Sequence, residues 1–323
     1  MGFGADHLIY NGPLPLSAGS DGERVELAFA DSVEAFVRTL TLGAARVTGV
    51  RLRPSMLSSR FGVPVEDESA LRAALAAATP GTPVGVSFHA RREDFGGATW
   101  RDVATDVLAR AGDLQERTGC HVLAFDVGGG WTPAEFDAAF EPDVRWLAGR
   151  IAATLPACAR LIVEPGQAVC TPTEALIVTV LEVRERGPRR ELVVDGGYPD
   201  WPQMHTYPHA LFAESGGSWV PVGAGPDRLL GRTCLEYDAV GGLRFPPGIG
   251  AGDRILIADT GSYDSSMAFD FGRGEDVELR SEHHSNRCDE FVGTHSHGTA
   301  TSTASEEPHG RVSNVPHSVM NDS

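Results

Sequence analysis

The sequence predicts a series of parallel βα units, then an antiparallel β domain, then a disordered C-terminal tail. Short apolar or β-branched runs alternate with Ala-rich stretches bearing Arg and Glu from about residue 25 to residue 175. After Glu164-Pro165-Gly166 the apolar runs are separated by Gly and Pro and lack long helical periods. From Glu275 onward Ser, His, Thr, Glu and Asn dominate, so this segment has too little apolar surface to offset its ordering entropy.

Strand followed by helix, repeated, is typical of a parallel sheet. In this part the expected strands are Val47–Leu52, Val84–His89, Val122–Val127 and Leu161–Glu164, and the expected helices are Ser69–Ala78, Trp100–Thr118 and Pro133–Leu155. In the β domain the expected strands are Ala175–Val183, Glu191–Val194, Arg228–Leu230 and Arg254–Ala258. The expected boundaries are residues 1–174, 175–274 and 275–323.

Length and composition exclude several classes of protein. A chain of 323 residues can build a large core, and its five cysteines form no C-x-x-C pair, so neither a disulfide scaffold nor a zinc site is expected. The formal net charge of -17 disfavours a nucleic-acid partner. No apolar run is long enough to span a membrane and the first residues lack a secretory signal, so a cytoplasmic location is expected. All 27 basic residues are Arg, and the sequence contains no lysine.

A glycine triplet directly after an expected strand is the strongest local signal, in Phe125-Asp126-Val127-Gly128-Gly129-Gly130. Residues without Cβ let backbone N–H groups approach an anion, and a helix beginning near Pro133 adds the positive end of its dipole. A phosphate fits such a site. A flexible turn is the alternative, because the segment matches neither G-x-G-x-x-G nor the Walker pattern.

Two other expected strands end in residues that could carry chemistry. Glu164 ends an apolar strand, a place where barrel enzymes hold catalytic groups, and a protonated ring nitrogen would be a suitable partner. The alternative is a strand-end carboxylate facing water. His89 ends Val86-Ser87-Phe88-His89, where a packed structural histidine is the alternative to a catalytic one.

Two segments of the expected β domain complete the candidates. Cys234 lies in Gly231-Arg232-Thr233-Cys234-Leu235-Glu236-Tyr237-Asp238, although a free cysteine is inert unless its pKa is lowered. Tyr263 lies in Gly261-Ser262-Tyr263-Asp264-Ser265, where its hydroxyl could reach a phosphate or cap a strand. Histidines of the tail could bind metal, but solvated low-complexity sequence is the simpler interpretation, so no metal site is predicted. They are His283, His284, His295 and His297.

Five motifs stand in the order found in fold-type III decarboxylases that use pyridoxal phosphate (PLP), the ornithine and diaminopimelate decarboxylase group. The motifs that resemble this family are V-G-V-S-F-H, F-D-V-G-G-G, V-E-P-G, G-R-T-C-x-x-x-D and G-S-Y-D-S-S-M-A-F. Fainter similarities precede them, and the resemblance covers roughly residues 8 to 272. It implies an incomplete (β/α)8 TIM-type barrel like that of alanine racemase, followed by a β domain that completes the site across a head-to-tail homodimer.

The resemblance also implies a role for each candidate. His89 would stack on the PLP ring, Glu164 would keep its pyridine nitrogen protonated, and Gly128–Gly130 together with Tyr263 would bind its phosphate. Cys234, reaching the partner subunit's site, would return a proton to the substrate after decarboxylation. The substrate is expected to be an amino acid.

Three positions depart from the family pattern. Residues 90–94 replace the family's Ser-Gly pair, so Arg91 or Arg92 would have to supply that phosphate contact, and Gln167 stands in place of the E-P-G-R arginine. The third departure is at the position directly after the cysteine. In the family an acid at this position contacts the substrate's distal amine, whereas here the residue is Leu235. Substrate contacts are instead expected from two acids of the same loop, Glu236 and Asp238, of which Glu236 could replace the missing acid. The alternative is a substrate that lacks the distal amine.

The largest departure concerns the family's first barrel strand, which carries the Schiff-base lysine. This chain has no lysine, and an arginine cannot replace it because its guanidinium stays protonated. The leading hypothesis is a PLP-dependent amino-acid decarboxylase whose amine comes from an N-terminal partner or a missing upstream segment. The second is a catalytically inactive homologue that regulates an intact decarboxylase. The third is a plain phosphate-binding barrel, which gives no role to Glu164 or Cys234.

Overall fold

The computed structural model describes residues 3–12, 16, 24–57, 59–76, 81–90, 98–155, 158 and 160–272. Its first sheet contains six strands in chain order, and every neighbouring pair is parallel. The strands are β1 (Ile9–Tyr10), β2 (Val25–Ala30), β3 (Ala45–Arg51), β4 (Pro83–Ser87), β5 (His121–Asp126) and β6 (Arg160–Ile162). Among the described residues β1 and β6 are the two terminal strands and the sheet does not close on itself, so the expected incomplete barrel of parallel βα units is confirmed.

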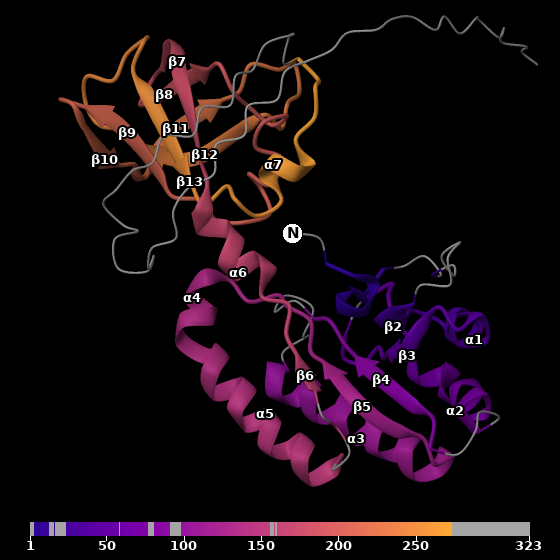
Figure 1. Ribbon diagram of the computed structural model, residues 1–323. Helices are drawn as coiled ribbons and strands as arrows, with labels where there is room; N and C mark the ends of the chain where they lie inside the picture. The colour runs from indigo at the N-terminus through magenta and orange to yellow at the C-terminus, as the bar shows by residue number, and fades with distance from the viewer. Residues whose placement is uncertain are drawn as a thin grey trace, which may run out of the picture. The chain divides into compact units, whose positions relative to one another are not determined.

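Helices alternate with these strands (Figure 1). They are α1 (Val33–Leu42), α2 (Glu68–Ala76), α3 (Trp100–Thr118), α4 (Pro133–Glu135) and α5 (Glu141–Thr154), with short turns η1 (Ala5–His7), η2 (Val65–Asp67) and η4 (Phe136–Phe140). The bounds of α3 match the expectation because both ends carry strong signals. Thr99 and Asp102 exchange hydrogen bonds in a capping box, and Gly119 ends the helix at a φ of 70°.

The segment expected as a helix over Pro133–Leu155 is helical through Thr154, but it is not a regular α-helix. The segment begins as α4, widens into the π-helical turn η4 and continues as α5. Pro142 lies in the first turn of α5 and has no N–H to donate to the preceding turn, and its ring excludes the carbonyl four residues earlier. A widened turn accommodates both effects, whereas apolar periodicity alone does not reveal it.

Apolar side chains cover both faces of the first sheet. The larger cluster lies between strands and helices and includes Phe36, Leu71, Phe88, Val107 and Phe125. The smaller cluster on the inner face contains Leu27, Phe29 and Ala124. A Cβ at Gly49 would lie 2.4 Å from the Phe29 ring, so a glycine there makes room for the phenyl group. The strands are thereby held in a rigid frame that positions the side chains at their carboxyl ends.

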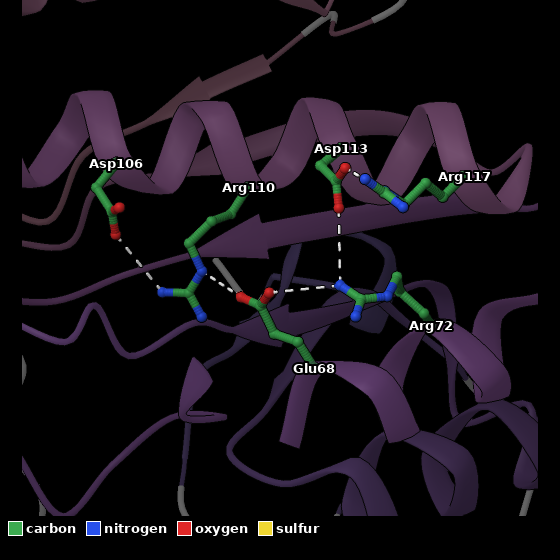
Figure 2. A network of polar contacts seen from close by, with 6 residues as sticks. All are labelled: Glu68, Arg72, Asp106, Arg110, Asp113 and Arg117. Carbon is green, nitrogen blue, oxygen red and sulfur yellow. Dashed lines mark hydrogen bonds and ion pairs between the residues drawn. The ribbon is translucent and has the colours of Figure 1, made fainter. Parts of the chain in front are cut away.

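A network of charged side chains joins α2 to α3 (Figure 2). Glu68 of α2 contacts Arg110 of α3 as well as Arg72, and Arg72 reaches Asp113 at 3.7 Å. The side chains of Glu68 and Arg110 are only 12% and 11% exposed. This burial makes the network a structural clamp rather than a solvated surface pair.

The second sheet has seven strands in the order β10-β9-β13-β7-β8-β11-β12. They are β7 (Ala175–Arg186), β8 (Arg189–Val194), β9 (Leu211–Ser215), β10 (Ser218–Pro221), β11 (Gly223–Leu230), β12 (Ala239–Arg244) and β13 (Arg254–Ala258). All neighbours are antiparallel except β8 and β11, so the sheet is mixed rather than purely antiparallel as expected. The connection between them is long and includes the β9–β10 hairpin, which lets β11 return in the direction of β8.

Short elements complete the described chain. The 3-10 turn η5 (Thr171–Thr173) and the helix α6 (Gly166–Cys170) join the two sheets in sequence, and α7 (Asp264–Met267) follows β13. None of the described helices combines the length and apolar character that a membrane span requires. The expected division at residues 174 and 175 stays a prediction. The expected disordered tail, its four histidines and both Arg91 and Arg92 lie outside the described residues.

Candidate active site

Three of the expected site elements follow three neighbouring strands of the parallel sheet. His89 comes shortly after β4, the glycine triplet Gly128–Gly130 after β5, and Glu164 after β6. Because β4, β5 and β6 are paired in this order and all run parallel, their carboxyl ends lie at the same edge. This edge is where parallel α/β folds position ligands.

The glycine turn fits tightly against the end of β6. Gly128 and Gly130 have φ values of 63° and 91°, which side chains rarely adopt. At Gly129 the backbone angle is ordinary, but a Cβ there would lie 2.1 Å from the backbone oxygen of Glu164. The Glu164 N–H donates to the Gly128 carbonyl at 2.7 Å and fixes the spacing. The turn is thus built around glycines for steric reasons, apart from any ligand.

The His89 imidazole connects the glycine turn to the carboxylate. The Gly129 N–H donates to His89 Nδ1 at 3.2 Å, and Oε2 of Glu164 lies 3.7 Å from the same nitrogen. One nitrogen cannot accept from Gly129 and donate to Glu164 together, so the two contacts belong to two forms of the ring: Nδ1 without a proton accepts from Gly129, and Nδ1 with a proton donates to Glu164. A proton on Nδ1 would switch the contact to Glu164. The side chains of His89 and Glu164 stay 34% and 37% exposed.

Glu164 also accepts a hydrogen bond from far along the chain. Nδ2 of Asn11, just after β1, donates to Oε1 of Glu164 at 2.9 Å. The contact with His89 and this amide lower the pKa of Glu164 against the opposing effect of burial. The carboxylate is therefore ionised at neutral pH and can pair with a cationic group.

Asp126, the last residue of β5, is a site residue for which the motif analysis proposed no role. Its side chain is fully buried, and Oδ1 accepts the Gly128 N–H at 2.8 Å. Burial, and then the negative charge of Glu164, raise the pKa of Asp126 to about 7. The signal that could have identified it is an acid ending an otherwise apolar strand, since an acid in such a place needs a compensating environment.

The Cys234 loop connects β11 to β12 in the second sheet. Cys234 and Glu236 are exposed, as access to a substrate requires. Asp238 is only 4% exposed and accepts hydrogen bonds from the Tyr198 N–H at 2.7 Å and from the Thr233 N–H at 3.0 Å. The Thr233 hydroxyl donates to it as well, at 2.6 Å. Asp238 thus holds the loop in shape, and its expected substrate contact stays a prediction.

Tyr263 precedes the short helix α7. Its backbone has a φ of 69°, its side chain is exposed, and its ring stacks on that of Tyr207 with centroids 6.1 Å apart. The structure brings His89, Gly128–Gly130 and Glu164 together. The contacts of Cys234 and Tyr263 with that group stay predictions.

Sequence comparison finds relatives among amino-acid decarboxylases. A lysine/ornithine decarboxylase of Selenomonas ruminantium is 26% identical over 300 residues, covering 84% of this chain and 71% of that protein. A diaminopimelate decarboxylase of Actinosynnema pretiosum is 28% identical over 201 residues, covering 58% of this chain and 44% of that protein. No protein-family model matches the chain.

Solved structures share the fold. The lysine decarboxylase of Selenomonas ruminantium superposes with a TM-score of 0.62 at 22% identity, covering 82% of this chain and 70% of that one. An arginine decarboxylase of Paramecium bursaria Chlorella virus, bound to agmatine, gives a TM-score of 0.60 at 17% identity and covers 77% and 69%. The structure of SrLDC in complex with PLP and cadaverine gives 0.64 at 22% identity, covering 83% of this chain and 70% of that one. The resemblance drawn from the motifs is confirmed: this chain is similar in sequence to amino-acid decarboxylases and shares the fold of solved decarboxylases.

Proposed function

We propose that this chain is the cofactor-binding and β-domain portion of a PLP-dependent amino-acid decarboxylase. The observation that carries the proposal is the convergence of His89, Gly128–Gly130 and Glu164 at one edge of the parallel sheet. A plain phosphate-binding barrel would need the glycine turn but neither the ionised Glu164 nor the exposed imidazole beside it. Sequence relatives with decarboxylase names support the same conclusion.

The donor set fits a pyridinium ring. Glu164 keeps its charge because its pKa is lowered, so it can accept a hydrogen bond from a protonated ring nitrogen. His89 offers a partly exposed aromatic face beside it. When bound, PLP supplies a ring that accepts the electrons left behind as carbon dioxide departs.

Of the three backbone N–H groups of the glycine turn, two already donate hydrogen bonds within the described part of the chain. The N–H groups of Gly128 and Gly129 donate to Asp126 and His89, whereas the Gly130 N–H has no partner within the described part of the chain. Gly130 is therefore the glycine of the turn whose N–H can take an anion without giving up another bond. Tyr263 would add its hydroxyl to the same phosphate.

The amine for covalent attachment must come from outside these 323 residues, because they include no lysine. A lysine-bearing segment could extend the parallel sheet beyond β1 or β6, which are its terminal strands in the described part of the chain. We propose either such a segment or a homologous partner chain, with two copies of this chain in a homodimer in which Cys234 serves the partner's site. A cytoplasmic location stays a prediction.

The cofactor site is tested by binding of PLP to the full chain, measured by equilibrium dialysis. Glu164→Gln should weaken binding about tenfold, because a charge-assisted hydrogen bond is replaced by a neutral one. Glu174→Gln, at an exposed position before β7, is the matched control and should bind like the wild type. Equal affinity in wild type and Glu164→Gln would contradict the assignment.

The activity is tested by adding a lysine-bearing N-terminal segment of a relative. Release of carbon dioxide from lysine, ornithine or diaminopimelate is expected in the mixture. Cys234→Ala should abolish this release, whereas Cys170→Ala, at another exposed cysteine, should not. No release despite complex formation would instead support the second candidate, an inactive homologue that binds an intact decarboxylase, which the absence of lysine favours.

A further inference from the structure

A buried histidine–aspartate pair lies in the second sheet's connections, apart from every motif role assigned above. Nε2 of His209 lies 3.0 Å from Oδ2 of Asp264, and both side chains are only 1% exposed. Nδ1 of the same ring lies 2.9 Å from the Tyr207 carbonyl, which can only accept, so Nδ1 carries a proton. The second carboxylate oxygen of Asp264 accepts the Gln203 N–H at 2.8 Å.

This pair lies beside a residue with an unusual backbone conformation. Asp264 directly follows Tyr263, whose φ of 69° and ψ of -32° fall in a region that residues with a Cβ rarely occupy. Such a backbone persists only when its surroundings hold it. The Tyr263 carbonyl accepts the Met267 N–H at 2.8 Å, so the turn is secured after Tyr263 by α7 and beside it by the Asp264 carboxylate.

The same imidazole also contacts the backbone of the residue whose ring packs on Tyr263. Tyr207, whose carbonyl accepts from His209, stacks its ring on that of Tyr263 at an interplanar angle of 21°. His209 therefore contacts two residues that adjoin Tyr263: Asp264, which follows it in the chain, and Tyr207, whose ring stacks on it. Both contacts of this buried side chain lead to the same exposed phenol.

We propose that the His209–Asp264 pair is a positioning device that orients the Tyr263 hydroxyl toward the cofactor phosphate. The inference rests on the proposed PLP site and assigns a purpose to a buried pair that touches no reacting atom. A pair that served only to stabilise the β domain would have no effect on phosphate recognition.

The test compares the binding of pyridoxal phosphate and of pyridoxal, which lacks the phosphate, to the full chain. The wild type should prefer pyridoxal phosphate, and Tyr263→Phe should reduce this preference about fivefold to tenfold, the effect of one lost hydrogen bond. Asp264→Asn should reduce the preference similarly. The double variant should be no worse than Tyr263→Phe alone, since both changes remove the same contact.

Asp227→Asn is the matched control, because Asp227 is another buried aspartate of the second sheet, where it pairs with Arg190. It should lower thermal stability without changing the phosphate preference. If Asp264→Asn does not fold, Tyr207→Leu removes the stacked ring and should reduce the preference instead. Additive effects of Asp264→Asn and Tyr263→Phe, or an unchanged preference in Asp264→Asn, would overturn the inference while leaving the PLP site intact. A wild type that binds neither compound would overturn the proposed function itself.

Discussion

Asp126 and Glu164 form a carboxyl pair at the ends of two adjacent parallel strands, in which, below about pH 7, Glu164 is charged while Asp126 keeps its proton. The pKa of Asp126 is raised to about 7, by burial first and then by the charge of Glu164. The pKa of Glu164 is lowered, by His89 first and then by the Asn11 amide. Only one negative charge therefore faces the proposed cofactor below neutral pH, which leaves that charge free to pair with a pyridinium nitrogen.

The first prediction concerns the pH dependence of stability. A carboxyl group whose pKa is higher in the folded than in the unfolded protein stabilises the folded state while it is protonated. For Asp126 this contribution is complete below the unfolded pKa and is lost as the pH rises through the folded pKa of about 7. Asp126→Asn keeps an acceptor for Gly128 and does not titrate. The free energy of unfolding of the variant relative to wild type should therefore increase by on the order of 2 kcal/mol from pH 5.5 to pH 8.5.

Urea unfolding at the two pH values measures this difference. The range from pH 5.5 to pH 8.5 lies above the lowered pKa of Glu164, so that group stays ionised throughout and does not contribute. A difference between variant and wild type that is constant with pH would show that Asp126 is ionised in the folded protein at both values.

The strands around this pair could be predicted from the sequence, but the pair could not. Buried parallel strands are short apolar runs, so the expected Val122–Val127 differs from β5 by one residue at each end. The charge on Glu164 depends on Asn11, which lies 153 residues away, and no local pattern reports such a contact. Likewise β10 has no buried residue and β12 has two glycines and none buried, so neither strand has the apolar alternation from which a strand can be predicted.

A second prediction concerns the glycine turn. Gly129→Ala places a methyl group against the Glu164 backbone oxygen, at a distance of 2.1 Å before relaxation. The turn and the end of β6 must shift, so the variant should lose about 1–3 kcal/mol of stability and bind PLP weakly. Gly149→Ala is the control, because Gly149 lies in α5 with open space around it. It should gain about 0.5–1 kcal/mol, and similar losses in both variants would contradict the steric argument.

A third prediction concerns the clamp between α2 and α3. Glu68→Gln leaves the nearly buried guanidinium of Arg110 without its main counter-charge, since its other carboxylate, Asp106, is 3.7 Å away (Figure 2). We expect a loss of about 2–3 kcal/mol in urea unfolding, because breaking a buried pair leaves an uncompensated charge. Glu141→Gln breaks a pair with Arg145 in which both side chains are more than three-quarters exposed, and it should leave stability nearly unchanged. Equal effects would mean that the clamp is solvated.

The last prediction concerns the loop that carries Cys234. In the wild type the Asp238 carboxylate accepts hydrogen bonds from the Tyr198 N–H, the Thr233 N–H and the Thr233 hydroxyl. Asp238→Asn replaces one carboxylate oxygen by an N–H₂ group, which cannot accept, so at least one of these donors loses its partner. The loop has no room to adjust, because a Cβ at Gly231 would already lie 2.0 Å from the Asp238 carboxylate. Cys234 should therefore sample more conformations and react faster with a maleimide, by about threefold to tenfold, as measured by mass spectrometry of the labelled peptide. Cys170, also exposed but before β7, reports the background rate and should react as in the wild type. An unchanged Cys234 rate would show that strands β11 and β12 hold the loop without Asp238.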